Sequence, residues 1–190
     1  QSIAAAAAIL QQSRRPLIIA GLGAHRAGAR PALERLADKT GAVIATTLKA
    51  KDMFRGYAYD LGIIGSFSHS AARRQIDQAD CVVAFGASMN QRTTSYGAAL
   101  PPEAPLIQVD ALRNHIGRWA HAEVGIVGDA RLVAERLTDA LPQRPQVELP
   151  FHTQENRRLL AGFSFAGDFL AEHTPHTVDP RSLALELDRL

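Results

Sequence analysis

Small residues, hydroxyl side chains and carboxylates follow each of five short apolar segments in this 190-residue chain. A backbone N–H group beside a glycine can approach a phosphate closely, and the N-terminus of a following helix favours negative charge. Thr and Ser hydroxyls add donors, and Asp carboxylates can accept hydrogen bonds from ribose hydroxyls. The combination indicates a nucleotide pocket. The positions concerned are Gly21, Gly23, Thr46, Thr47, Gly86, Ser88, Asp110, Gly128 and Asp129.

This pattern departs from the fingerprint of nicotinamide dinucleotide proteins. That fingerprint needs a third glycine at position 26, where this chain has Arg26. It also needs an acidic residue after the second strand, where this chain has Thr46 and Thr47. An independent nicotinamide-linked oxidoreductase is therefore disfavoured. Gly21 and Gly23 are also consistent with a tight strand-to-helix turn that binds no ligand.

No residues in the sequence are spaced as a nucleophile–base pair or as a metal motif. His69 is expected to be exposed on the first turn of a helix, beside Arg73. His173 and His176 fall in an irregular segment, and none of the histidines occurs in a His-Glu-x-x-His pattern. Cys81 lies within an apolar segment and is expected to be a buried small hydrophobe. We therefore assign no catalytic residue and no metal ligand.

The composition is that of an ordinary globular protein, with 46% hydrophobic and 21% charged residues. The 21 basic and 19 acidic residues give a formal net charge of +2. This is too small an excess of positive charge to indicate nucleic-acid binding. No apolar run approaches the roughly 18 residues of a membrane span. A single cysteine excludes a disulfide framework, and the alanine-rich start lacks the basic region of a signal peptide. We expect a cytoplasmic protein without nucleic-acid or membrane partners.

The apolar segments alternate with helical patterns, which predicts a doubly wound, Rossmann-like α/β domain with a parallel sheet of about five to six strands. The segment 49–65 has no clear period and is expected to be a long functional loop. Strands are expected at 17–20, 42–45, 81–85, 106–110 and 124–127. Helices are expected at 3–12, 26–39, 68–78 with Ser68 as its cap, 130–141 and 154–160.

The predicted organisation is a domain over 1–141, a linker segment over 142–178, and the start of a further domain over 179–190. The linker begins with a stretch rich in Pro and Gln. Asp179–Pro180 then opens a helical pattern whose leucines share one face. That pattern stops without a Gly or Asn, and the first residue is Gln rather than Met. We therefore expect a piece of a longer protein.

Taken together, these segments resemble the central domain of thiamine diphosphate-dependent enzymes, the group that holds acetolactate synthase, glyoxylate carboligase, benzoylformate decarboxylase and oxalyl-CoA decarboxylase. The resemblance runs from about Ile3 to Leu141, and the order and spacing of the segments are specific. The tail Val178–Leu183 is similar to the first helix of the third domain of these enzymes. The matching segments are Arg15–Ala24, Ala27–Ala29, Thr46–Lys51, Leu61–Gly65, Ala79–Ser88, Gln108–Asp110 and Val127–Ala130.

The resemblance implies that catalysis belongs to flanking domains. In that family a glutamate of the first domain and a Gly-Asp-Gly motif of the third serve thiamine diphosphate and Mg²⁺. Neither Gly128–Ala130 nor Gly167–Phe169 fits that motif. The resemblance therefore implies a parent decarboxylase or carboligase, a homo-oligomer that acts on a 2-oxo acid or an aldehyde. This piece alone is expected to be inactive.

The resemblance also implies a fold that holds FAD in some members, ADP or CoA in another, and nothing in several. Flavin-binding members have Met-His-Gly where this chain has Ser66–Ser68, and two Asp and a further Arg within the stretch Gly86–Arg92. Each lost charge-assisted contact is worth about 1.5–3 kcal/mol, which weakens the case for FAD. A nucleotide-binding regulatory or scaffolding domain without chemistry is the alternative. The residues expected to hold a nucleotide are Gly21, Gly23, Thr46, Leu48, Gly65, Gly86, Ser88, Arg92, Asp110 and Asp129.

Overall fold

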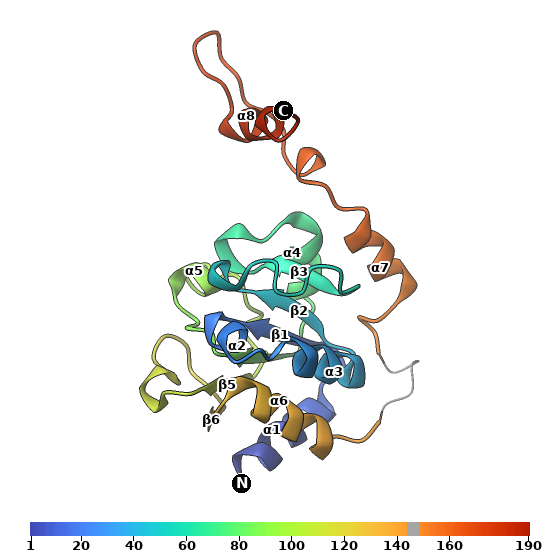
Figure 1. The fold of residues 1–190 in the computed structure, drawn as a ribbon, viewed down its shortest axis with the longest axis vertical. Helices are drawn as coiled ribbons and strands as arrows, with labels where there is room; N and C mark the ends of the chain where they lie inside the picture. Colours follow the sequence, from blue (N-terminus) through green and yellow to red (C-terminus); the bar gives the residue numbers. More distant parts are fainter. Residues whose placement is uncertain (144–148) are drawn as a thin grey trace.

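The computed structural model describes residues 1–143 and 149–190 and places a six-stranded sheet between two layers of helices (Figure 1). The strand order is β3-β2-β1-β4-β5-β6, and every pairing within the sheet is parallel. The doubly wound α/β fold class is therefore confirmed. The strands are β1 (Pro16–Ala20), β2 (Val43–Thr46), β3 (Asp60–Ile63), β4 (Cys81–Phe85), β5 (Leu106–Asp110) and β6 (Val124–Val127).

The central strands β1 and β4 are continuous apolar runs, because both faces of the sheet are covered there. Every residue of β1, β4 and β5 is buried. Cys81 is among them, as expected, and burial raises the pKa of its thiol to about 12. This thiol stays protonated at neutral pH and packs as a small apolar side chain.

Four helices cover one face of the sheet, and fewer cover the other (Figure 1). Helices α4 and α7 lie on the second face, α5 is a single short turn, and α8 belongs to the C-terminal segment that runs away from the sheet. Among the described residues, no helix is long and apolar enough to cross a membrane. The first face carries α1 (Ser2–Gln12), α2 (Leu22–Arg26), α3 (Arg30–Thr40) and α6 (Ala130–Ala140). The others are α4 (Ser70–Ile76), α5 (Gln91–Thr94), α7 (Gln154–Ala161) and α8 (Pro180–Leu187).

Two expectations about the secondary structure were wrong. The helix expected over 26–39 is two helices, because Gly28 adopts a left-handed φ of 60° between α2 and α3. The segment 49–65 is not all loop, since it contains the edge strand β3. That strand is short, only Leu61 in it is fully buried, and Gly62 interrupts it, so it has no clear two-residue period.

The cap of α4 also differs from expectation. The helix begins at Ser70, and its N-cap is His69, whose Nδ1 accepts a hydrogen bond from the Ala72 N–H at 3.1 Å. Ser68 lies one residue too early, and its Oγ is buried with no hydrogen-bond partner among the described residues. The helices expected at 3–12, 130–141 and 154–160 are confirmed within one or two residues. Part of the expected linker, 144–148, lies outside the described residues.

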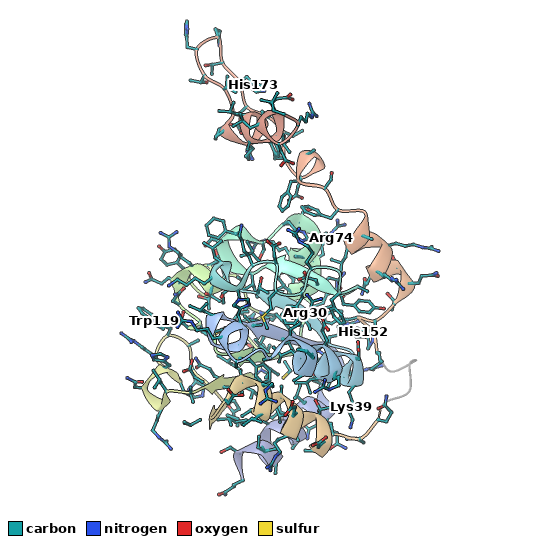
Figure 2. All side chains as sticks on the ribbon, in the orientation of Figure 1. Arg30, Lys39, Arg74, Trp119, His152 and His173 are labelled. Carbon is teal, nitrogen blue, oxygen red and sulfur yellow. The ribbon has the colours of Figure 1, made fainter. Side chains whose placement is uncertain are left out.

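Two histidines attach the C-terminal segment to the sheet. The His152 ring stacks on Tyr59 with centroids 3.8 Å apart and planes 7° apart, and its Nε2 lies 2.8 Å from the Ala42 carbonyl oxygen (Figure 2). Because a carbonyl only accepts, Nε2 carries the hydrogen. His69 stacks on Phe163 at 3.8 Å. Burial lowers the pKa of both imidazoles below their ordinary value of 6.5, which favours the neutral rings.

Acidification is expected to destabilise this fold through these two rings. The unfolded chain binds a proton at each histidine more readily than the folded chain does. The free energy of unfolding is therefore highest above about pH 6.5 and falls as the pH drops below that value. Urea unfolding measured between about pH 7.5 and pH 5.5 checks the slope.

His152→Gln keeps a donor for Ala42 but removes the titrating ring, so it is expected to flatten that slope. His176→Gln serves as the control, because His176 is exposed and its surroundings change little on unfolding. If the unfolding free energy of His152→Gln depends on pH as steeply as that of the original chain, the assignment of acid sensitivity to His152 is wrong.

Candidate functional site

The order of the strands reverses between β1 and β4, which is where doubly wound sheets commonly bind ligands. Here the two loops at that point touch each other. The Gly21 N–H donates to the Phe85 carbonyl at 2.9 Å, and the Gly23 N–H donates to the Gly86 carbonyl at 3.0 Å. The Gly86 N–H donates to the Val109 carbonyl at 2.8 Å. These three predicted phosphate donors are thus engaged within the fold.

The same glycines allow two backbones to lie in contact. A Cβ at Gly21 would come within 2.1 Å of the Gly86 carbonyl oxygen, and a Cβ at Gly86 within 2.5 Å of the Ala24 nitrogen. Gly86 also adopts a left-handed φ of 54°. The absence of side chains at these positions therefore serves close packing between the β1–α2 turn and the loop after β4.

A small pocket of about 170 Å³ opens beside this contact, at the carboxyl ends of β2, β3 and β4. Its apolar wall is formed by Leu48, Ile64 and Phe67. Its polar wall carries two cations, and none of the described residues that line it is a carboxylate. Such a pocket favours an anion. The polar lining residues are Thr47, Lys49, Ser88, Asn90, Arg92 and Thr93.

The polar wall is held in place by Asn90. Its Oδ1 caps α5 by accepting hydrogen bonds from the Arg92 and Thr93 N–H groups at 3.1 and 3.2 Å. Its Nδ2 donates to the Ser88 Oγ at 3.0 Å. A Cβ at Gly65 would lie 2.1 Å from the Arg92 carbonyl oxygen, so the chain after β3 packs directly on α5. The backbone of Arg92 is fixed from both sides.

The structure brings some of the sequence-predicted site residues together and leaves others apart. Leu48, Ser88 and Arg92 line the pocket. Thr46 is buried behind it and donates its hydroxyl to the Gly62 carbonyl at 3.2 Å, and Gly65 supports α5.

The two predicted ribose-binding carboxylates lie outside this pocket. Asp129 is the N-cap of α6, and its Oδ1 accepts from two backbone N–H groups at 3.0 Å. Asp110 is buried at the end of β5, where it accepts from the Leu112 N–H at 3.0 Å and lies 3.1 Å from the His115 Nδ1. Both carboxylates therefore organise local backbone.

Sequence reasoning missed Lys49, Asn90 and Thr93. Lys49 lies within the segment Thr46–Lys51 that carried the family resemblance, but its charge was not singled out. Asn is a preferred capping residue, and Asn90 caps the four-residue helix α5. Among the described residues, no three or more His, Cys, Asp or Glu side chains gather where they could hold a metal ion.

Fold and pocket together define a Rossmann-like α/β domain with a cationic pocket at its strand ends. Residues 3–137 match the family described as "Thiamine pyrophosphate enzyme, central domain". The chain belongs to this family, and the resemblance seen in the sequence is confirmed.

Relatives give the same result. An acetolactate synthase of Mycobacterium bovis is 33% identical over 133 residues, which cover 70% of this chain and 22% of that protein. A sulfoacetaldehyde acetyltransferase of Roseovarius nubinhibens is 35% identical over 136 residues, covering 70% of this chain and 23% of that protein. The matched region thus spans less than a quarter of the length of these two relatives.

A solved structure from Mycobacterium smegmatis, described as a thiamin diphosphate-dependent enzyme, shares the fold. Its TM-score is 0.62 at 23% identity, over 76% of this chain and 28% of that chain. At this level of identity the likeness concerns the fold alone.

The backbone contact at Gly86 can be tested against a glycine of similar conformation. Gly28 has a φ of 60° and nothing within 4 Å of an added Cβ, so Gly28→Ala is expected to cost about 1–2 kcal/mol from conformation alone. Gly86→Ala adds overpacking and is expected to cost about 1–3 kcal/mol more. Urea unfolding of the two variants measures the difference, and equal losses would argue against a tight loop contact.

Proposed function

We propose that this chain is the central domain of a thiamine diphosphate-dependent decarboxylase or carboligase that resembles acetolactate synthase. Its membership of the central-domain family supports this proposal, as does its relation to proteins about three times its length. The parent would be a lyase or a transferase acting on a 2-oxo acid or an aldehyde. The domain itself would do no chemistry.

The proposed organisation follows the sequence pattern. Residues 1–141 form the central domain, 142–178 connect it onward, and 179–190 begin the next domain, in which α8 is the first helix. Thiamine diphosphate and Mg²⁺ would be held by flanking domains, since the described residues offer no carboxylate cluster for the metal. When bound there, the cofactor supplies the carbanion chemistry of the parent. The lone cysteine supports a cytoplasmic location, and the family relation supports a homo-oligomer.

We further propose that the pocket after β2 and β4 binds the phosphate portion of FAD or ADP. One observation carries this proposal. The cations Lys49 and Arg92 and the hydroxyl residues Thr47 and Ser88 line the same pocket, and none of its described lining residues is a carboxylate. A pocket of about 170 Å³ is too small to enclose a whole nucleotide. Leu48 is half exposed beside it and could contact a ring that extends outward.

Titration of the chain with FAD and with ADP tests this proposal, read by flavin fluorescence and by calorimetry. Arg92→Ala and Lys49→Ala each remove a charge-assisted contact worth about 1.5–3 kcal/mol, which weakens binding by about tenfold to a hundredfold. Arg157→Ala, an exposed arginine on α7, is the control and should leave the affinity unchanged.

The outcomes separate the ligands and the site. Saturable FAD binding would favour the acetolactate synthase branch, and ADP binding alone would favour the acyl-CoA branch. Asp110→Ala reports whether the bound nucleotide extends to the end of β5. Absence of binding by both ligands would reject the pocket but not the family assignment.

The assignment of the parent has its own test. The complete parent sequence is expected to contain a Gly-Asp-Gly motif followed by paired asparagines shortly after Leu190. A parent without that motif would contradict a thiamine diphosphate-dependent enzyme.

A further inference from the structure

A pocket of about 680 Å³ lies where the C-terminal segment meets the chain before α4. We call it the phenylalanine pocket, because Phe67, Phe165 and Phe169 line it. Phe67 ends the short turn before α4, and the other two belong to the segment between α7 and α8, which runs away from the sheet in Figure 1. Phe67 and Phe165 are 50% and 69% exposed, so much of their ring surface is open to a ligand.

Specific contacts join the two walls of this pocket. The His69 ring stacks on Phe163, and the Ser70 N–H donates to the Asp168 carboxylate at 3.2 Å. The Ser70 hydroxyl donates to the same carboxylate. Phe163 also makes an edge contact with Phe165, with ring centroids 5.0 Å apart. These contacts fix the C-terminal wall relative to the chain before α4.

Negative charge reaches the pocket from three sources. Two are the carboxylates of Asp168 and Asp188, which both line it. Hydrogen bonding from Ser70 lowers the pKa of Asp168, so this group is ionised at neutral pH. The third source is the C-terminal turn of α8, whose carbonyl groups carry partial negative charge. Arg74 also contributes to the lowered pKa of Asp168, but it does not line the pocket.

Arg181 is the only Lys or Arg among the described residues that line the pocket, and its charge is already paired. Its Nη2 lies 2.6 Å from one Asp179 carboxylate oxygen, and its Nε lies 3.0 Å from the other. The Arg181 guanidinium carbon is 4.3 Å from the Phe169 ring centroid, so one ring of the pocket already carries a cation on its face. Burial lowers the pKa of His69, which favours its neutral ring. The described lining therefore has an excess of negative charge.

One buried hydroxyl at this pocket has no partner. Ser68 lines the pocket, and its Oγ makes no hydrogen bond to any of the described residues. Buried polar groups in folded proteins nearly always make a hydrogen bond, so an unpaired one calls for a ligand or an ordered water. A ligand with a hydroxyl or amine group beside its positive charge would supply the missing partner.

We propose that the phenylalanine pocket binds a small organic cation, an alkylated ammonium ion that carries a hydroxyl or amine group. The faces of aromatic rings attract such cations, and proteins recognise alkylated ammonium groups with clusters of these rings. Here Phe67 and Phe165 offer exposed ring surface, while Asp168 and Asp188 supply the complementary charge. The inference does not rest on the nucleotide pocket, because Phe67 is the only described residue that lines both pockets.

Titration of the chain with choline, followed by the NMR signals of the backbone amides, tests the proposal. Choline is a trimethylated ammonium ion with one hydroxyl group. Its uncharged isostere, in which carbon replaces the ammonium nitrogen, has the same shape. We expect choline to bind saturably in the millimolar range and to shift the amide signals of residues 66–69 and 165–169. The isostere is expected to bind at least about two- to fivefold more weakly, because it lacks the charge.

Two variants locate the binding site. Asp188→Asn and Phe165→Ala are each expected to weaken choline binding by about two- to fivefold. Asp188→Asn should leave the affinity for the isostere nearly unchanged, because only the cation interacts with the lost charge. Asp139→Asn on α6 removes an equal charge on the other face of the sheet, and Leu170→Ala removes a side chain that is 90% exposed in the same C-terminal segment. Both controls should leave choline binding unchanged.

The amide spectrum also verifies that each variant is folded. Three results would each overturn the proposal: no saturable shift with choline, equal affinities for choline and its isostere, or shifts confined to residues outside the phenylalanine pocket. Folded Asp188→Asn and Phe165→Ala variants that bind choline as tightly as the original chain would overturn it as well.

Discussion

The backbone contact between Gly21–Gly23 and Gly86 is the constraint on which the carboxyl edge of this sheet depends. It joins the loops after β1 and β4 at the point where the strand order reverses. A doubly wound sheet commonly leaves a crevice there, and the N–H groups lining that crevice bind phosphate. In this chain the glycine N–H groups bind carbonyls of the neighbouring loop instead. The pocket that the structure does show lies beside this contact, at the loops after β2, β3 and β4.

The displaced pocket is organised by backbone contacts as well. Gly65 lets the chain after β3 press on α5, and Asn90 caps the same helix from within. These contacts fix the backbone of α5. Arg92 and Lys49 supply positive charge at the pocket. Asp110 and Asp129 lie outside this pocket and accept hydrogen bonds from backbone N–H groups. The anion site that we propose here has no metal-binding group beside it among the described residues.

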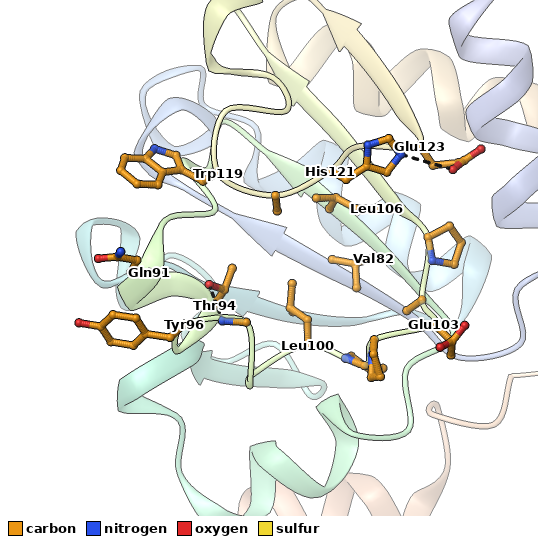
Figure 3. A pocket seen from close by; sticks show the side chains of 16 residues that line it. Val82, Gln91, Thr94, Tyr96, Leu100, Glu103, Leu106, Trp119, His121 and Glu123 are labelled. Carbon is orange, nitrogen blue, oxygen red and sulfur yellow. Dashed lines mark hydrogen bonds and ion pairs between the residues drawn. The ribbon is translucent and has the colours of Figure 1, made fainter.

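The remaining asymmetry concerns the faces of the sheet. Four helices cover one face over a single core, whereas the core on the second face is covered by α4, α7 and the loops that carry Met89, Leu100 and Ala120. The connections after β4 and β5 contain little helix, so apolar strand residues lie beneath loops, with Trp119 and Tyr96 at the surface (Figure 3). The order of the strands alone would indicate a sheet with helices over both faces. The structure shows that helices cover one face of the sheet fully and the other face only in part.

The sequence by itself determined the parallel sheet and the buried state of Cys81, because continuous apolar runs are local and strong signals. The family followed separately, from the resemblance of its ordered segments to a known central domain. The sequence did not determine the edge strand β3, whose residues are half exposed and follow no period, or the cap at His69, since Ser68 is the more usual capping residue. Only the tertiary structure decided which strand ends form a pocket. Pocket formation depends on which N–H groups other loops have already engaged, and on contacts such as Gly65 with Arg92, which are 27 residues apart along the chain.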